Sequence, residues 1–67
     1  MNIQKNFKKF RTEKQLSQEE LAKLVGTTRQ TIISIEKEVF IPSSKLAFLL
    51  CIALDTKFED MFYFDSH

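Results

Sequence analysis

The stretch that decides the fold is SQEELAKLVGTTRQTIISIEK, residues 17–37. Ser17 and Glu20 match a capping box, in which each side chain accepts from a backbone N–H at the start of a helix. A helix is therefore expected over 18–25. Gly26, the single glycine of the chain, follows where a helix end requires a positive φ. The pattern predicts a helix that stops at a forced turn.

A second helix is expected over 29–37, after two threonines that can cap it. Ile32 and Ile35 form an apolar stripe along this helix. Ala22 is small where the preceding helix passes closest. Two helices with these features cross steeply through a short turn, which is typical of a helix-turn-helix motif.

The remaining chain predicts three more helices and two short strands. Apolar spacing and start signals place the helices over 7–14, from Ser43 or Ser44 to Leu54, and over 57–62 with Thr56 as the cap. Residues 1–4 and 62–65 alternate loosely and can pair as a small antiparallel sheet. We expect an all-α five-helix bundle, extended by this sheet, in one domain spanning residues 1–67.

Composition excludes several classes of protein. The chain is 43% hydrophobic and 28% charged, with one Gly and one Pro, which is typical of a compact helical domain. It has no long apolar run or signal peptide, so we expect a cytoplasmic protein without membrane contact. Cys51 lies in an apolar run and is expected to be a buried thiol, and His67 to be a frayed end. We expect no metal, cofactor, small-molecule ligand or enzymatic activity.

Charge is divided unevenly along the chain. Residues 1–37 hold eight Lys and Arg against four acids, a balance of +4, whereas residues 38–67 hold two against five, a balance of −3. The formal net charge of +1 therefore conceals a basic half that suits a polyanion.

The chain resembles the helix-turn-helix domain of the lambda and 434 phage repressors and of the XRE family of bacterial regulators. The matching segments are Phe10-Arg11, LSQEELA at 16–22, VGTTRQTI at 25–32, Ile35-Glu36, Pro42-Ser43 and EDMF at 59–62. The aromatic tail is similar to that of short stand-alone members such as the cytolysin repressor, which add a small sheet. The resemblance implies a lambda-repressor-like bundle that binds double-stranded DNA with the 29–37 helix in the major groove.

The resemblance also implies roles for individual residues. It places four residues against the bases: Arg29, Gln30, Ile33 and Ser34. Five residues are expected to contact phosphates: Gln18, Thr28, Thr31, Lys37 and Ser43. Arg11 and Glu36 are expected to form a structural ion pair. The residue types fit these roles, because an arginine fork matches guanine, a glutamine amide matches adenine, and Ile33 can touch a thymine methyl.

Two departures from the family pattern matter. Glu38 stands in a turn where many relatives carry Asn-Gly-Lys, and its charge argues against a phosphate contact there. The helix up to Leu54 is apolar nearly all round. These surplus apolar residues either enlarge a small core or form a homodimer interface, and we favour the interface. Its expected residues are Leu49, Ile52, Phe58 and Met61.

The sequence leaves two functions open. We expect a transcriptional regulator, a repressor that acts as a homodimer on a palindromic operator. The alternative is an antitoxin-like module that uses the same fold to bind a second protein. The two differ in whether a partner changes the stoichiometry of the DNA complex.

Overall fold

The computed structural model describes residues 2–3 and 7–63. Within them the elements follow in the order β1 (Asn2–Ile3), α1 (Phe7–Glu13), α2 (Gln18–Val25), α3 (Arg29–Glu36), α4 (Ser44–Ala53), α5 (Phe58–Met61) and β2 (Phe62–Tyr63). The predicted five-helix architecture is confirmed. So is the antiparallel pairing of the two ends, although residues 1, 4, 64 and 65 of the expected strands, like His67, lie outside the described residues.

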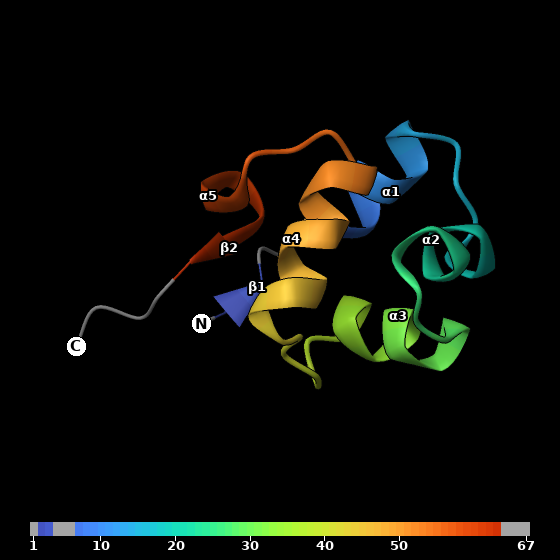
Figure 1. Ribbon diagram of the computed structural model, residues 1–67, viewed down its shortest axis with the longest axis horizontal. Helices are drawn as coiled ribbons and strands as arrows, with labels where there is room; N and C mark the ends of the chain where they lie inside the picture. The colour runs from blue at the N-terminus through green and yellow to red at the C-terminus, as the bar shows by residue number, and fades with distance from the viewer. Residues whose placement is uncertain (1, 4–6, 64–67) are drawn as a thin grey trace.

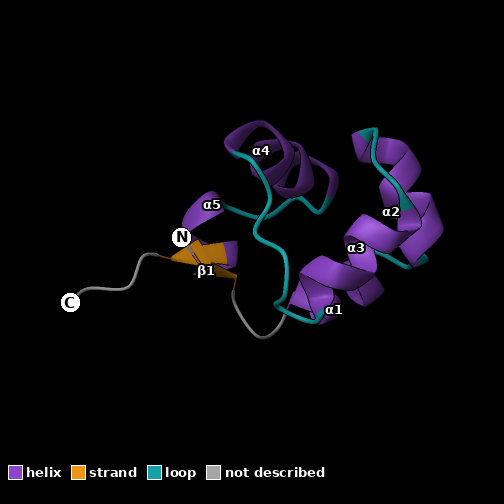
Figure 2. Ribbon diagram, turned by 90° about the horizontal axis from the view of Figure 1, so that it is seen from below, coloured by secondary structure: helices purple, strands orange, loops and turns teal. Residues whose placement is uncertain are grey.

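The two ends of the molecule are built from different elements. Figure 1 shows α2 and α3 together at one end and the two-stranded sheet with α5 at the other. The same separation is visible from below in Figure 2. The contact between α2 and α3 is the most extensive between any two elements of the described chain. The helix pair predicted from residues 17–37 therefore packs together directly.

Among the described helix starts, those of α2, α3 and α4 carry a side-chain cap. The Ser17 hydroxyl accepts from the Glu20 N–H at 3.0 Å, and the Glu20 carboxylate accepts from the Ser17 N–H at 2.9 Å, which completes the predicted capping box. The hydrogen bond from the Ser17 backbone is the main reason that the pKa of the Glu20 carboxyl is lowered. The Thr28 and Ser43 hydroxyls cap α3 and α4 by accepting from the Thr31 and Leu46 N–H groups. These local signals were readable from the sequence because each spans only four residues.

The prediction that Thr56 caps the last helix is wrong. Lys57 occupies the cap position of α5 and provides no side-chain hydrogen bond. The Thr56 hydroxyl instead donates to the Leu54 carbonyl at 2.9 Å, and its backbone N–H returns to the Cys51 carbonyl at 2.9 Å. Thr56 therefore belongs to the turn that closes α4.

Four helix ends share one kind of closing turn. In each, a residue with positive φ is followed by a residue whose N–H reaches back into the helix. The positive-φ residues are Gln15 (58°), Gly26 (73°), Glu38 (62°) and Asp55 (50°). The returning bonds run from Leu16 to Arg11, Thr27 to Ala22, Val39 to Ser34 and Thr56 to Cys51. Since glycine marks only one of these turns, the other three had no sequence signal.

The core combines apolar side chains from all five helices. The buried set comprises Phe7, Leu21, Ala22, Val25, Ile32, Ile35, Ala47, Leu50, Cys51, Leu54, Met61 and Phe62. The predicted stripe of Ile32 and Ile35 is completely buried, which fixes the inner face of α3. Cys51 is a buried thiol, as predicted, and burial raises its pKa. In the part of the chain that is described, no helix is long and apolar enough to span a bilayer.

The strained turn after α3 generates a stability prediction. Glu38→Gly removes the Cβ of a residue held at φ 62°, a conformation that costs an L residue about 1–2 kcal/mol. Part of this gain is offset by the greater freedom of glycine in the unfolded chain. We expect a net gain of about 0.5–1 kcal/mol, seen as a rise in Tm of about 2–8 °C at fixed protein concentration.

Glu38→Ala is the control for this experiment, because it removes the charge and keeps the Cβ. The account fails if alanine stabilises the protein as much as glycine, or if glycine lowers Tm.

Candidate nucleic-acid interface

The outer face of α3 carries every residue expected to read bases. Arg29 and Gln30 are exposed in its first turn, and Ile33 and Ser34 are half-buried one turn later. The eight residues of α3 give a helix about 12 Å long, with donors, acceptors and a methyl surface on one side. The structure thus brings these four side chains to one continuous surface.

Two threonines meet at the start of α3. The Thr28 hydroxyl accepts from the Thr31 N–H at 3.2 Å, and the two hydroxyl oxygens lie 3.0 Å apart, so one hydroxyl donates to the other. This contact uses one of the two hydroxyl hydrogens, so the other hydroxyl can still donate to an acceptor such as a phosphate oxygen. Both residues lie near Arg29, at the N-terminal end of α3.

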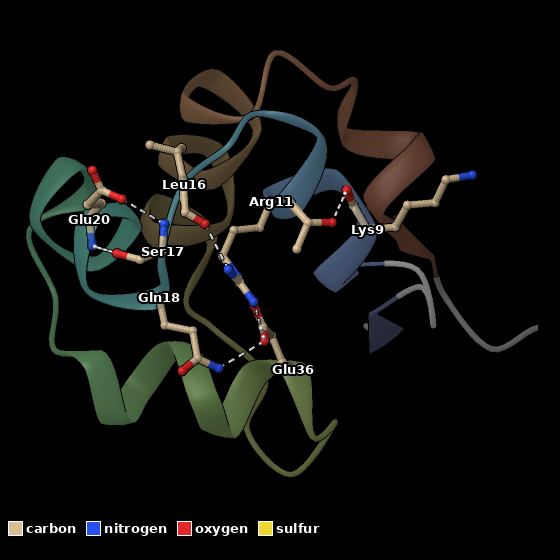
Figure 3. Close-up of polar contacts among 8 residues, drawn as sticks. Lys9, Arg11, Leu16, Ser17, Gln18, Glu20 and Glu36 are labelled. Carbon is tan, nitrogen blue, oxygen red and sulfur yellow. Dashed lines mark hydrogen bonds and ion pairs between the residues drawn. The ribbon is translucent and has the colours of Figure 1, made fainter.

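A buried ion pair joins α1 to the end of α3 (Figure 3). Arg11 Nε donates to Glu36 Oε2 at 2.5 Å, and Arg11 Nη2 donates to Oε1 at 3.3 Å. Only 9% and 7% of the two side chains are exposed. Arg11 Nη1 also donates to the Leu16 carbonyl at 2.7 Å, which ties in the turn before α2. Arg11 and Glu36 therefore form the pair expected of them, and the pair spans three segments of the chain.

Gln18 is the third member of this network, which sequence reasoning missed. Its Nε2 donates to Glu36 Oε1 at 3.1 Å. Because a carboxylate only accepts, the amide nitrogen of Gln18 faces Glu36 and the carbonyl oxygen is turned away, as Figure 3 shows. One N–H of Gln18 is therefore engaged inside the protein, and the amide has a second N–H with which it can donate.

The connection from α3 to α4 contains the last two expected phosphate residues. Lys37 is exposed at the end of α3, and exposed Ser43 caps α4 by accepting from the Leu46 N–H at 3.3 Å. Between them Glu38 turns the chain. The next three residues, Val39, Phe40 and Ile41, are 74%, 44% and 42% exposed. The sequence-based predictions did not include this run, although three successive large apolar residues outside a helix are a visible signal.

Comparison with known sequences identifies the family. A helix-turn-helix family model matches residues 7–61. An HTH-type transcriptional regulator of Archaeoglobus fulgidus is 46% identical over 59 residues, which cover 88% of this chain and 83% of that protein. Another from Methanocaldococcus jannaschii is 43% identical over 64 residues, 96% of this chain and 97% of that protein. The chain belongs to the helix-turn-helix family of transcriptional regulators, of the Cro/C1 type.

Solved structures agree with this assignment. The restriction-modification controller protein C.AhdI of Aeromonas hydrophila superposes with a TM-score of 0.78 at 33% identity, over 87% of this chain and 84% of that one. The clp gene regulator ClgR of Corynebacterium glutamicum superposes with a TM-score of 0.75 at 26% identity, over 81% of this chain. The matched region is 57% of the ClgR chain. The regulator thus has the lambda-repressor-like fold that its sequence predicted.

The expected dimer surface of the regulator needs one correction. Ile52 is 76% exposed on α4, and Leu49 and Phe58 are half-buried. Met61, however, is completely buried, because α5 is a single turn whose end brings Met61 and Phe62 into the core. Met61 therefore cannot contribute to a surface.

Phe48 takes the place of Met61 on this side of the molecule. It is 55% exposed, and its ring lies 5.0 Å from that of Phe58. With Ile52, Cys51 and the α4–α5 turn, the two rings line a groove of about 590 Å³. Across residues 2–3 and 7–63, no group of three or more His, Cys, Asp or Glu could hold a metal ion.

The ion pair generates a prediction for stability. Arg11→Met leaves the Glu36 carboxylate buried without its countercharge, so we expect a loss of about 3 kcal/mol and a fall in Tm of about 12–24 °C. The double variant Arg11→Met/Glu36→Leu removes both charges and is expected to lose less than the single variant. Thermal unfolding at one protein concentration measures both.

The control is the exposed ion pair in which Lys14 Nζ lies 3.6 Å from Asp55 Oδ2. Lys14→Met is expected to change the free energy of unfolding by about 0.5 kcal/mol or less. A double variant that loses as much stability as Arg11→Met alone, or more, contradicts the account.

Proposed function

We propose that this regulator is a repressor that binds a two-fold symmetric operator as a homodimer, with α3 of each copy in the major groove. One observation carries the proposal. The two faces of α3 are sharply different, since Ile32 and Ile35 are completely buried while Arg29 and Gln30 are exposed beside them. An α-helix fits the major groove, where each base pair presents a distinct pattern of donors and acceptors.

The chemistry of the outer face supports direct reading of bases. The Arg29 fork can donate to guanine O6 and N7, and the Gln30 amide can pair with adenine N6 and N7. Ile33 and Ser34, one turn further along, supply a contact for a thymine methyl and a hydroxyl for either kind of base edge. Each good bidentate pair contributes about 1–3 kcal/mol of discrimination.

Five further residues fit contacts with the DNA backbone, which set position without reading sequence. They are Gln18, Thr28, Thr31, Lys37 and Ser43, all of them exposed or half-buried. Gln18 differs from the rest because Glu36 fixes its amide on the inner side. Its remaining N–H is presented in one orientation, which lowers the entropy lost when a phosphate binds.

The apolar side of α4 and α5 supports the homodimer. Ile52, Phe48, Leu49 and Phe58 present apolar surface beside the α4–α5 groove, and a small domain gains stability when such a surface is covered. The acidic balance of residues 38–67 suits a side turned away from DNA. Two copies would place their α3 helices in half-sites about 34–36 Å apart.

Repression is the simplest action for a protein whose described residues form a DNA-binding fold, because a protein that occupies an operator can block transcription by its presence alone. Its place of action is then the cytoplasm. Selection of bound sequences from random duplexes at several salt concentrations tests the proposal. A palindrome with half-sites about 10–10.5 base pairs apart, or a multiple of that spacing, is expected. Equal recovery of all sequences would refute it.

The role of Arg29 gives a prediction on specificity. Arg29→Ala removes a bidentate base contact and keeps the backbone contacts, so binding to the operator should weaken about 5- to 150-fold while binding to unrelated DNA changes little. Arg29→Lys is the matched control, since it keeps the charge and loses the fork. We expect it to lose specificity as well. Equal losses on both DNAs would show that Arg29 contacts phosphate.

The dimer surface gives a separate prediction. Ile52→Lys places a charge on the most exposed apolar residue of α4 and should yield monomers in sedimentation at concentrations where the unmodified protein is dimeric. Leu24→Lys is the control, because Leu24 is 63% exposed on α2, away from this surface. If Ile52→Lys sediments like the unmodified protein, the interface lies elsewhere.

A further inference from the structure

Three successive apolar side chains are left exposed beside the recognition helix. Val39, Phe40 and Ile41 are 74%, 44% and 42% exposed, whereas the following Pro42 is buried. We call residues 39–41 the apolar loop. Exposed apolar area costs about 25 cal/mol per Å² compared with the same area buried, so a contiguous run of this kind indicates a contact surface.

The apolar loop is held in one shape from both sides. Before it, the Glu38 N–H donates to the Ile35 carbonyl at 3.0 Å and the Val39 N–H donates to the Ser34 carbonyl at 3.1 Å. After it, Ser43 caps α4. The three side chains are therefore presented by a defined turn anchored on α3 itself.

The position of the loop separates it from the proposed dimer surface. It joins the end of α3 to the start of α4, and Figure 1 shows it on the side of the molecule where α3 lies, opposite α5. The α4–α5 groove is lined by residues from Phe48 onward, toward the other end of a helix about 15 Å long. The apolar loop is instead continuous with the DNA-reading face, because Lys37 and Ser43 flank it.

The charge of this segment decides which part of DNA it fits. From residue 38 to residue 44 the chain has no cation, and Glu38 adds a negative charge. The loop therefore cannot neutralise phosphates. The backbone also presents the C–H surface of deoxyribose, which is apolar and uncharged, at the edges of the groove that α3 enters.

We propose that the apolar loop packs against deoxyribose rings at the edge of each half-site, an inference that rests on the proposed insertion of α3 into the major groove. Val39 and Phe40 supply the contact. It adds affinity that is independent of base sequence and, unlike the contacts of Lys37, independent of salt.

The test uses the operator obtained by selection and the double variant Val39→Ser/Phe40→Ser. We expect its affinity to fall about tenfold on operator and unrelated DNA alike, with an unchanged slope of log affinity against log salt. Lys37→Ala, in contrast, should lower the magnitude of that slope by about 0.9. Leu24→Ser is the matched control for losing an exposed apolar side chain, and should bind like the unmodified protein.

Hydroxyl-radical footprinting adds a readout specific to sugars, because these radicals attack deoxyribose hydrogens. The double variant should lose protection at a few sugars flanking each half-site and keep it elsewhere. Unchanged affinity and footprint would overturn the proposal. So would dissociation of the dimer by the double variant, which would assign the loop to a second copy. Failure of the unmodified protein to select any sequence would instead refute the proposed function.

Discussion

The buried ion pair between Arg11 and Glu36 sets where α3, the helix proposed to read DNA, lies. Through it α1 holds the last residue of α3, and the same two side chains also bind the Leu16 carbonyl and the Gln18 amide. Desolvation offsets much of the Coulomb attraction in such a pair, so its main effect is on geometry. The pair fixes α3 relative to α1 and α2, and thereby fixes the proposed base-reading residues relative to the residues proposed to contact phosphates.

A second constraint acts from the opposite side of α3. Ile32 and Ile35 anchor the helix in the core, so rotation about its axis would expose both of them and bury the Arg29 guanidinium. Polar and apolar forces therefore fix the same orientation. The inner face of this eight-residue helix packs in the core, and the outer face is the one proposed to read bases, so substitutions on the outer face are expected to leave the fold intact.

The sequence predicted those parts of the fold that depend on local signals. The capping box at Ser17, the turn at Gly26 and the isoleucine stripe each involve residues within one or two helical turns. Prediction failed where the decisive contact is tertiary, as for Gln18, whose partner is 18 residues away, or for Met61, which the end of α5 carries into the core. The positive φ of Glu38 had no signal either, because backbone hydrogen bonds impose it on an unfavourable residue type.

The central claim is that the outer face of α3 occupies the major groove in two successive half-sites. Dimethyl sulfate tests it most directly, since it methylates guanine at N7 in the major groove and adenine at N3 in the minor groove. On the selected operator, the protein should protect guanine N7 in two clusters separated by about 10–10.5 base pairs or a multiple, and leave adenine N3 reactive. Protection of adenine N3 with guanine N7 still reactive would contradict the account.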